Sequence, residues 1–251
     1  MKKKTIAISG GLGRIGFSLA LKFAQNNFNV LIGDNNVNKY KILKKEIDLN
    51  NIKFFKGNLC IDKDIDKFIN FGVHHFGKID YTVHSCYPKT KDWGSKLDNL
   101  KQSSLNENIS NHLGGSIIYS QRFIKHFLTN NGGKLIHISS IQGVSAPKFE
   151  HYEGLKMNSP IAYTAIKSGI IAITKYLAKY YGKKNIQVNC ISPGGIKDNQ
   201  PKVFIKRYKN SCLSKGLLDI NDLQPIVFFL TSDNSKYING QNIIIDDGWS
   251  L

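Results

Sequence analysis

The sequence predicts an α/β fold, a doubly wound parallel sheet of about seven strands with helices on both faces. Three observations predict this fold. Short apolar runs alternate with helical segments from one end of the chain to the other. A glycine-rich turn joins the first apolar run to the first helical segment. The 251 residues suit one large α/β domain, and neither a linker nor a repeat divides them, so we expect residues 1–251 to form a single domain.

Four strands are predicted in the first half of the chain. Residues 5–9 (TIAIS) are a short apolar run that ends in glycines, as a buried strand does, and apolar residues at helical spacing follow at 15–23. The same alternation then predicts strands at 30–33, 53–56 and 79–83 and helices at 39–47 and 62–76. Because each helix connects two strands that run in the same direction, the sheet is expected to be parallel.

The second half of the chain continues the pattern after a polar segment at 88–104, which leads into helical sequence ending near Leu128. Three more apolar runs predict strands, and three stretches of helical periodicity predict helices. The strands are expected at 134–139, 186–191 and 242–246, and the helices at 162–181, 201–209 and 221–230.

The composition is strongly basic, with a formal net charge of +17. Of the 35 basic residues only three are arginine, and the lysines are scattered from end to end. Nucleic-acid binders gather arginines and interleave them with aromatic residues, and this sequence does neither, so we expect no nucleic-acid partner. A positive surface does attract anionic small molecules such as phosphates and nucleotides.

Cysteine spacing and hydropathy indicate the class of protein. No apolar run approaches the ~18 residues that a membrane-spanning helix needs, so we expect no membrane partner. The basic start (MKKK) is followed within a few residues by glycines, so we expect no signal peptide. The cysteines Cys60, Cys86, Cys190 and Cys212 lie far apart and form no C-x-x-C pair. This spacing excludes a disulfide or zinc scaffold, and we expect no metal site and a reducing, cytoplasmic location.

Three glycines, Gly10, Gly13 and Gly16, occupy the turn between the first predicted strand and the first predicted helix. They allow a tight turn and a close backbone approach, and the helix N-terminus behind them offers free N–H groups to a pyrophosphate. Glycines also form plain turns, so the dinucleotide interpretation depends on their position in the first strand–helix unit.

Asp34 stands at the end of the second predicted strand, 18 residues after Gly16. Its carboxylate can accept hydrogen bonds from the adenosine ribose and would repel a 2′-phosphate, which favours NAD over NADP. Asp34 could instead be a turn former before Asn35, and the nearby cations Arg14 and Lys39 could accommodate a 2′-phosphate. We expect NAD as the cofactor, with NADP as the alternative.

Tyr163 and Lys167 begin the long predicted helix four residues apart, so the phenol and the ammonium share one face. A free tyrosine has a pKa of about 10 and is a poor base at neutral pH. A neighbouring cation favours the phenolate and is expected to lower that pKa. Ser139 and Ser140, at the end of the strand predicted at 134–139, could supply a hydroxyl that orients a substrate carbonyl.

Over its full length the chain resembles the short-chain dehydrogenase/reductase family, whose compact branch is a single-domain Rossmann-type fold. The matching blocks, in order, are residues 9–16, 34, 78–80, 111–114, 138–143, 163–167, 189–194 and 237–249. The resemblance implies that Tyr163 is the general acid/base, that Lys167 lowers its pKa and holds the nicotinamide ribose, and that Ser140 polarises the carbonyl. Asn111 is implied to help bind a proton-relay water. The implied cofactor-binding residues are Gly10, Gly13, Arg14, Ile15, Gly16, Asp34, Asn58, Leu59, Cys86, Tyr163, Lys167, Pro193 and Ile196.

A second Y-x-x-x-K pattern begins at Tyr152, which lies nearer the family's usual distance from the catalytic serine than Tyr163 does. Gly154 weakens a helix there and Pro160 would interrupt it, so the phenol and the ammonium would not be held on one face. We therefore assign the catalytic role to Tyr163. Residues 145–160 then become an inserted loop beside the active site.

Several positions depart from the family pattern. Arg14 stands where the compact branch usually has glycine, and the resulting G-x-x-G-x-x-G is typical of an extended branch whose longer chains 251 residues cannot accommodate. Tyr87 ends the segment HSCY, which replaces Asn-Asn-Ala-Gly, and is expected to reshape the floor of the pocket. Asn58 replaces an Asp that contacts adenine, an isosteric change. Asp198 replaces a Thr that contacts the nicotinamide carboxamide, so we do not assign that contact.

Residues 87–88, 146–154 and 193–201 resemble a narrower group, the oxidoreductases of bacterial surface-sugar pathways such as flagellin modification and nonulosonic-acid synthesis. This resemblance implies interconversion of a secondary alcohol and a ketone on a sugar or sugar phosphate, with residues 195–215 as a substrate-side loop and helix. Lys148 could bind the anionic group of such a sugar or could simply be a solvated surface residue.

Two other functions stay open: a cofactor-binding regulator without turnover, and an enzyme acting on a non-sugar carbonyl such as a 3-oxoacyl group or a polyol. Family resemblance also implies a homo-oligomer, a tetramer or dimer, paired through the helices around 112–128 and 163–181.

Overall fold

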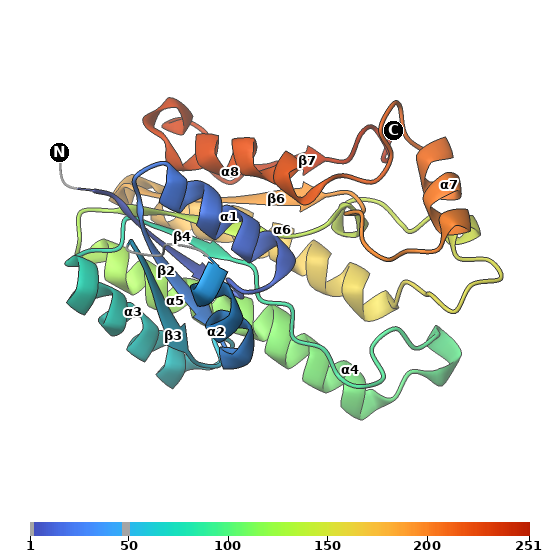
Figure 1. Ribbon diagram of the computed structural model, residues 1–251, viewed down its shortest axis with the longest axis horizontal. Coiled ribbons are helices and arrows are strands. Elements are labelled where there is room, and N and C mark those ends of the chain that lie inside the picture. The colour runs from blue at the N-terminus through green and yellow to red at the C-terminus, as the bar shows by residue number, and fades with distance from the viewer. Residues whose placement is uncertain (1–2, 47–50) are drawn as a thin grey trace.

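The computed structural model describes residues 3–46 and 51–251, and its seven strands form one sheet in the order β3-β2-β1-β4-β5-β6-β7 (Figure 1). Every neighbouring pair of strands is parallel. The predicted fold class, a doubly wound parallel α/β sheet in one domain, is confirmed. The strands are β1 (Thr5–Ser9), β2 (Asn29–Asp34), β3 (Ile52–Lys56), β4 (Tyr81–His84), β5 (Gly133–Ile138), β6 (Ile186–Pro193) and β7 (Asn242–Ile245).

Helices cover both faces of the sheet (Figure 1). Phe23 of α1 and Val227 of α8 belong to the hydrophobic core on one face, and Phe68 of α3 and Phe123 of α5 belong to the core on the other. The helix α6 packs on the same face as α3 and α5. The helices are α1 (Arg14–Gln25), α2 (Val37–Glu46), α3 (Asp62–Phe76), α4 (Gln102–Ile109), α5 (Gly115–Leu128), α6 (Ile161–Tyr181), α7 (Lys202–Asn210) and α8 (Gln224–Thr231).

Apart from the helix predicted at 221–230, each helix whose start was predicted begins within two residues of the predicted start. The helix predicted at 39–47 begins at Val37, and its last predicted residue, Ile47, lies outside the described residues. The helix predicted at 221–230 is divided into a 3₁₀ turn, Ile220–Leu223, and the α-helix α8. Pro225 lies in the first turn of α8, where a residue without a backbone N–H is tolerated, so the α-helix begins only there.

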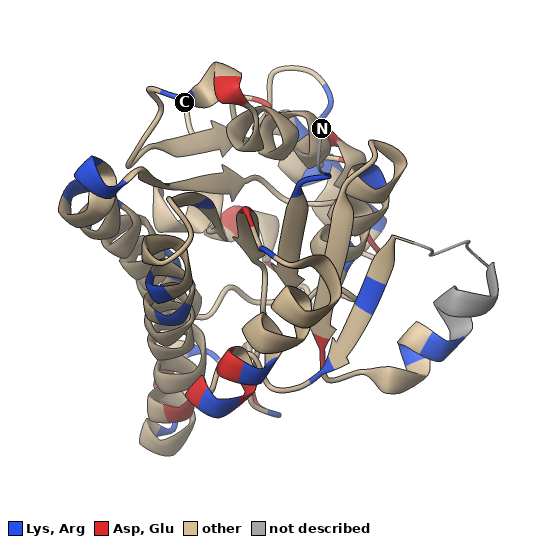
Figure 2. Cartoon of the chain, turned by 90° about the vertical axis from the view of Figure 1, so that its left-hand side faces the viewer, with Lys and Arg blue, Asp and Glu red and all other residues tan. Residues whose placement is uncertain are grey.

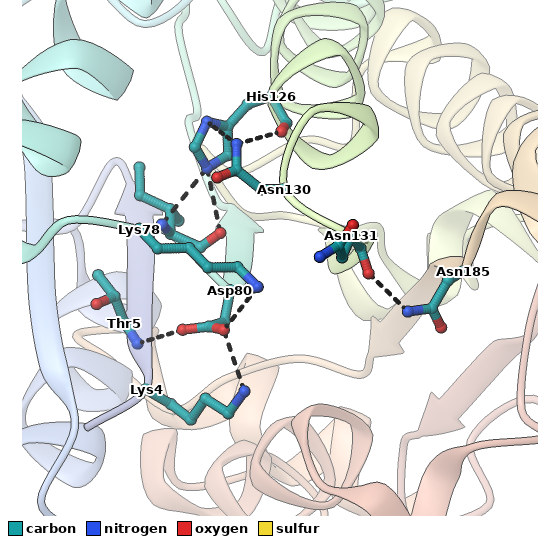
Figure 3. Close-up of polar contacts among 9 residues, drawn as sticks. Lys4, Thr5, Lys78, Asp80, His126, Asn130, Asn131 and Asn185 are labelled. Atoms are coloured by element: carbon teal, nitrogen blue, oxygen red, sulfur yellow. Dashed lines mark hydrogen bonds and ion pairs between the residues drawn. The ribbon is translucent and has the colours of Figure 1, made fainter. Parts of the chain in front are cut away.

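The amino-terminal edge of the sheet is held by Asp80, which precedes β4 (Figure 3). Its carboxylate accepts the backbone N–H of Thr5 at 3.0 Å and lies 3.1 Å from the ammonium of Lys4 and 3.4 Å from that of Lys78. A side-chain carboxylate thus takes the place of a strand carbonyl, and β4 begins at Tyr81 rather than at residue 79 as predicted. These contacts bind β1 to the start of β4 and give this edge a structural role.

The opposite edge is where a ligand can bind. The strands β1 and β4 are neighbours in the sheet, although the chain passes from β1 to β2 and β3 before it returns to β4. Such a reversal leaves a crevice between the loops that follow the two strands, and doubly wound sheets bind ligands there. The glycine turn after β1 and the start of α6, which follows β5, both lie at this edge.

Figure 2 shows Lys and Arg residues on many elements of the fold. Within the described residues, no helix combines the length and the hydropathy that crossing a membrane would require.

Candidate active site

The turn between β1 and α1 requires glycine at two positions. Gly10 has φ +63°, and a Cβ there would lie 2.8 Å from the carbonyl oxygen of Ser85. A Cβ on Gly16 would lie only 2.4 Å from the carbonyl oxygen of Gly10. The backbone N–H of Gly13 donates to that same carbonyl at 2.9 Å and closes the turn. The three predicted glycines therefore form one tight loop that leaves the start of α1 open.

The N-terminus of α1 fits a pyrophosphate. Its N-cap residue is the exposed Gly13, no side chain caps the helix, and its first turn contains no acidic residue. The first N–H groups of a helix have no intrahelical acceptor, and the positive end of the helix dipole lies beside them. An anion at this position would accept hydrogen bonds from these N–H groups and would be attracted by the positive end of the dipole. Phosphates bind in this way at the glycine turns of other doubly wound folds.

Asp34, the last residue of β2, lies beside this turn. Its carboxylate accepts the backbone N–H of Leu12 and that of Asn36, each at 3.0 Å. Each carboxylate oxygen has two lone pairs, so Asp34 can still accept hydrogen bonds from ribose hydroxyls. The ammonium of Lys39 donates to the Leu12 carbonyl, so this predicted cation is held by the glycine turn itself.

A pocket of about 230 Å³ extends from the glycine turn past Asp34. Asn58, Leu59 and Cys86, all predicted to contact the cofactor, line it together with Gly10 and Gly13. The Asn58 side chain accepts the backbone N–H of Cys60 at 3.1 Å, which orients the loop after β3 toward the pocket. A groove with a phosphate-binding helix end and an acidic residue fits an adenine dinucleotide.

Tyr163 and Lys167 lie one turn apart near the start of α6, as predicted. The Lys167 ammonium donates to the Ile138 carbonyl at 2.9 Å and lies 5.5 Å from the centre of the Tyr163 ring. The two serines after β5 differ in their contacts. Both line the neighbouring pocket, but the Ser139 hydroxyl donates to the Lys167 carbonyl at 2.8 Å, whereas the Ser140 side chain accepts the backbone N–H of Gln142 at 3.2 Å and keeps its own O–H available as a donor. Ser140 is thus placed to meet a substrate.

The expected lowering of the tyrosine pKa is not found. Burial raises the pKa of Tyr163 above its usual value, and a hydrogen bond with Ser140 opposes only part of that rise. Burial lowers the pKa of Lys167 to about 7. Desolvation, which the four-residue spacing does not reveal, disfavours the charged form of both groups. The lysine is also directed at the Ile138 carbonyl and the face of the ring, so it does not pair with the phenol oxygen.

Asn111 lies in a π-helical turn, Ser110–Gly114, that joins α4 to α5. Turns of this kind insert an extra residue into a helix and are frequent at functional sites. Asn111 is half-buried there, and the next residue, His112, is only 1 % exposed. The His112 ring packs edge-on against Tyr87, with centroids 5.1 Å apart, and Tyr87 in turn packs against Tyr163. His112 was not predicted as a site residue.

A second pocket, of about 480 Å³, opens beside Ser140 and Tyr163. The predicted cofactor residues Arg14, Ile15, Pro193 and Ile196 line its edge, next to the glycine turn. Its other lining residues are mainly aromatic or capable of hydrogen bonding. They include Tyr87, Gln142, Tyr152, Asp198, Gln200, Phe204, Tyr208 and Trp249.

The segment predicted as an insert, residues 145–160, supplies part of this pocket. Gly154 has φ +71°, and no helix forms after the short 3₁₀ turn Phe149–His151. Tyr152 lines the pocket, where its hydroxyl accepts the Gln142 amide at 3.2 Å and its ring packs against Phe204 of α7. The second Y-x-x-x-K pattern therefore contributes a pocket residue and not a helical Tyr–Lys pair.

Two pocket contacts could not be read from the sequence. The Arg14 guanidinium extends from α1 across the pocket edge and lies 3.1 Å from the carboxylate of Asp198. Trp249 is 2 % exposed, and its indole N–H has no hydrogen-bond partner. No spacing or motif pairs residues this far apart in the chain, because loops that meet at a sheet edge follow no fixed interval. Trp249 lay within a block that matched the family, which was the only signal for it.

Comparison with known proteins agrees with this geometry. A family model described as "Enoyl-(Acyl carrier protein) reductase" matches residues 12–250. "Post-translational flagellin modification protein A" of Campylobacter coli is 40% identical over 257 residues, which cover 100% of both chains. A short chain dehydrogenase of Leptospira borgpetersenii with bound NAD+ superposes with a TM-score of 0.88 at 29% identity, covering 100% of this chain and 94% of that one. ElxO with NADP bound superposes with a TM-score of 0.84 at 25% identity, covering 99% of each chain.

Proposed function

The chain belongs to the short-chain dehydrogenase/reductase family and is an NAD(P)-dependent oxidoreductase acting on a small molecule, and from this premise we propose that it interconverts a secondary alcohol and a ketone on a sugar or sugar phosphate. One observation carries the proposal. The pocket beside Ser140 and Tyr163 mixes aromatic faces with hydrogen-bonding groups, which suits a ring that has both apolar C–H faces and hydroxyls. The similarity to a flagellin modification protein supports a surface-glycan pathway.

The proposed chemistry uses three side chains. In the direction of oxidation, Tyr163 accepts the proton of the substrate hydroxyl and Ser140 donates a hydrogen bond to the reacting oxygen. A positive charge on Lys167, 5.5 Å from the Tyr163 ring, would favour the phenolate, and the hydrogen bond with Ser140 lowers the pKa of Tyr163 against the burial that raises it. The nicotinamide, when bound, exchanges the hydride with the substrate carbon. The residues that would hold the dinucleotide are those of the glycine turn, Asp34 and the loop after β3.

NAD is the cofactor that we propose. Asp34 places a negative charge where a 2′-phosphate would have to lie, and the repulsion disfavours NADP. The Arg14 guanidinium is paired with Asp198, and the Lys39 ammonium donates to a backbone carbonyl. Neither cation is therefore directed at Asp34 to offset its charge.

We also propose that the substrate is anionic and that the enzyme is a homo-oligomer in a reducing compartment, the cytoplasm. The Lys148 ammonium lies 4.9 Å from the centre of the ring of Trp249, which lines the pocket that would hold the sugar. The helices α5 and α6 expose large side chains, Ile117 at 46%, Tyr176 at 66% and Tyr180 at 67%, which favours a tetramer or dimer paired through them. All four cysteines are free thiols.

The test is a turnover screen with NAD+ and NADP+. Free sugars, sugar phosphates and nucleotide-linked sugars form one panel, with the corresponding keto-sugars for the reverse direction, and the absorbance of reduced nicotinamide reports turnover. Turnover of a sugar supports the proposal. Turnover restricted to 3-oxoacyl thioesters, or to the enoyl thioesters that the description of the matching family model names, would overturn the sugar assignment. Binding of NAD+ without turnover of any panel member would indicate a regulator.

A further inference from the structure

A third pocket, of about 470 Å³, opens at the amino-terminal edge of the sheet, opposite to the edge that carries the glycine turn and Tyr163. The starts of β4, β5 and β6 line it together with the 3₁₀ turn Asp233–Ser235, which follows α8. Its volume is close to the 480 Å³ of the pocket beside Ser140, and both volumes are in the range of small-molecule sites. The proposed oxidoreductase activity gives this third pocket no role.

The charged residues of this pocket are mainly basic. Four lysines and two aspartates line it: Lys4, Lys78, Lys134, Lys236, Asp80 and Asp233. Two of the lysines share one carboxylate, because Asp80 lies 3.1 Å from the Lys4 ammonium and 3.4 Å from that of Lys78 (Figure 3). One negative charge cannot neutralise two ammonium groups, so the pocket keeps an excess of positive charge. A hollow lined by one sign of charge attracts ligands of the opposite sign, here anions.

Lys134, the second residue of β5, is a half-buried cation of this pocket. Its ammonium donates to two uncharged acceptors, the Ser232 carbonyl at 2.5 Å and the Ser235 hydroxyl at 3.2 Å. Among the residues that the structure describes, it forms no ion pair with a carboxylate. Burial lowers the pKa of Lys134, and the charge of Asp233 opposes only part of this fall. A bound anion would favour the charged form of this lysine and offset its desolvation.

The rim of the pocket across from Asp80 is a fixed backbone turn. Asn131, Gly132 and Asn185 have positive φ values of +61°, +102° and +57°, which glycine and asparagine adopt more readily than other residues. The Asn185 side-chain amide donates to the Asn131 carbonyl at 2.7 Å and joins the start of β6 to the start of β5. Figure 3 shows these two asparagines across from Asp80 and its two lysines, and all five residues line the pocket. Because the rim is held by its own contacts, a ligand can bind with little rearrangement of this turn.

We propose that this pocket binds a small organic phosphate ester with at least two negative charges, at a site separate from the active site. None of the described residues that line it is arginine, and lysine ammonium groups bind phosphate as point charges. A volume of about 470 Å³ holds more than an inorganic ion, which favours a phosphate ester over free phosphate. Because the pocket lies at the opposite edge of the sheet, its ligand can bind together with the dinucleotide, and the inference does not depend on the proposed function.

The test is isothermal titration calorimetry of the full-length protein at constant ionic strength, saturated with NADH so that no phosphate binds at the glycine turn. Fructose 1,6-bisphosphate is the probe, with inorganic phosphate and citrate for comparison, and we expect the bisphosphate to bind most tightly. Lys134→Met should raise its dissociation constant at least about tenfold, because a charge-assisted hydrogen bond is lost. Asp233→Asn, which removes a negative charge from the pocket, should lower the dissociation constant by about two- to fivefold. Lys175→Met, at an exposed position of α6, is the matched control and should keep the dissociation constant of the natural protein.

The opposite signs expected for Lys134→Met and Asp233→Asn separate a ligand site from a structural role, because damage to the fold would not strengthen binding. If Lys134→Met does not fold, Lys236→Met replaces it: Lys236 is exposed, and its loss should weaken binding by about two- to fivefold. Failure of the bisphosphate to bind to the NADH-saturated protein would overturn the inference, as would binding that none of the three variants changes. Tighter binding of citrate than of the bisphosphate would overturn the assignment to a phosphate ester.

Discussion

Replacing Lys167 with methionine should stabilise the fold while it removes activity. The side chain is 4% exposed, and burial lowers the pKa of its ammonium from 10.5 to about 7. A lysine that holds its proton less tightly in the folded state destabilises that state at neutral pH. Methionine has a similar length and no charge to desolvate, so Lys167→Met removes this penalty and the positive charge that Tyr163 requires.

The size of the effect follows from the fall in pKa. A fall from 10.5 to about 7 corresponds to about 5 kcal/mol of unfavourable free energy at or below pH 7. The ammonium also donates to the Ile138 carbonyl at 2.9 Å, and the variant leaves that carbonyl without this partner, which costs about 1–3 kcal/mol. We therefore expect Lys167→Met to raise the free energy of unfolding by about 2–4 kcal/mol at pH 7.

The gain in the free energy of unfolding of Lys167→Met should decrease as the pH rises above 7. Between pH 7 and 10.5 the unfolded chain binds more protons at this lysine than the folded chain does, so the stability of the natural protein rises with pH in that window. The advantage of Lys167→Met should shrink by about 1.4 kcal/mol for each pH unit above 7. Urea unfolding of both proteins at pH 6.5, 7.5 and 8.5 measures the difference in their free energies of unfolding. Lys175→Met, at an exposed position of α6, is the control. A variant that is less stable than the natural protein at pH 6.5, or an advantage independent of pH, would refute the reasoning.

Three further predictions concern the two pockets. Gly16→Ala places a Cβ 2.4 Å from the Gly10 carbonyl oxygen and should weaken NADH binding by more than about tenfold in a fluorescence titration. The control is Gly114→Ala, whose Cβ would lie 3.8 Å from its nearest neighbour and which tests whether the fold tolerates alanine in place of glycine. Asp34→Ala should raise the dissociation constant of NADH and reduce its advantage over NADPH at least about tenfold; an unchanged ratio of the two constants would contradict the role of Asp34. Trp249→Phe removes the unpaired indole N–H, which is free to donate a hydrogen bond to the substrate. Because one hydrogen bond contributes about 0.5–1.5 kcal/mol, the variant should raise KM up to about tenfold with little change in kcat. A fall in kcat at constant KM would argue against a hydrogen bond from Trp249 to the substrate.

The fold could be predicted because its signals are local. Alternation of buried strands with amphipathic helices shows directly in the apolar pattern, and the glycine turn shows in the chain because Gly10 and Gly16 occupy positions that a Cβ would fill. The four-residue interval between Tyr163 and Lys167 likewise follows from helix geometry alone. Such features need no knowledge of what lies across the sheet.

The features of the site that could not be predicted depend on contacts between distant segments of the chain. The ion pair of Arg14 with Asp198 joins the start of α1 to the loop after β6, and nothing in either segment indicates the other. The direction of the Tyr163 pKa was predicted wrongly because desolvation is set by the residues that surround α6, and their number cannot be counted from an interval in the sequence.

The central claim is that the Tyr163 hydroxyl carries the proton of an alcohol–ketone interconversion beside a dinucleotide held by the glycine turn. Single-turnover measurement of hydride transfer in Tyr163→Phe, with NADH affinity determined on the same preparation and Tyr237→Phe at a 90% exposed tyrosine as the control, tests it most directly. The account predicts a rate lower by about 10²–10⁴-fold and an affinity for NADH that is retained. A Tyr163→Phe enzyme that binds NADH and transfers hydride at the rate of the natural protein would contradict it.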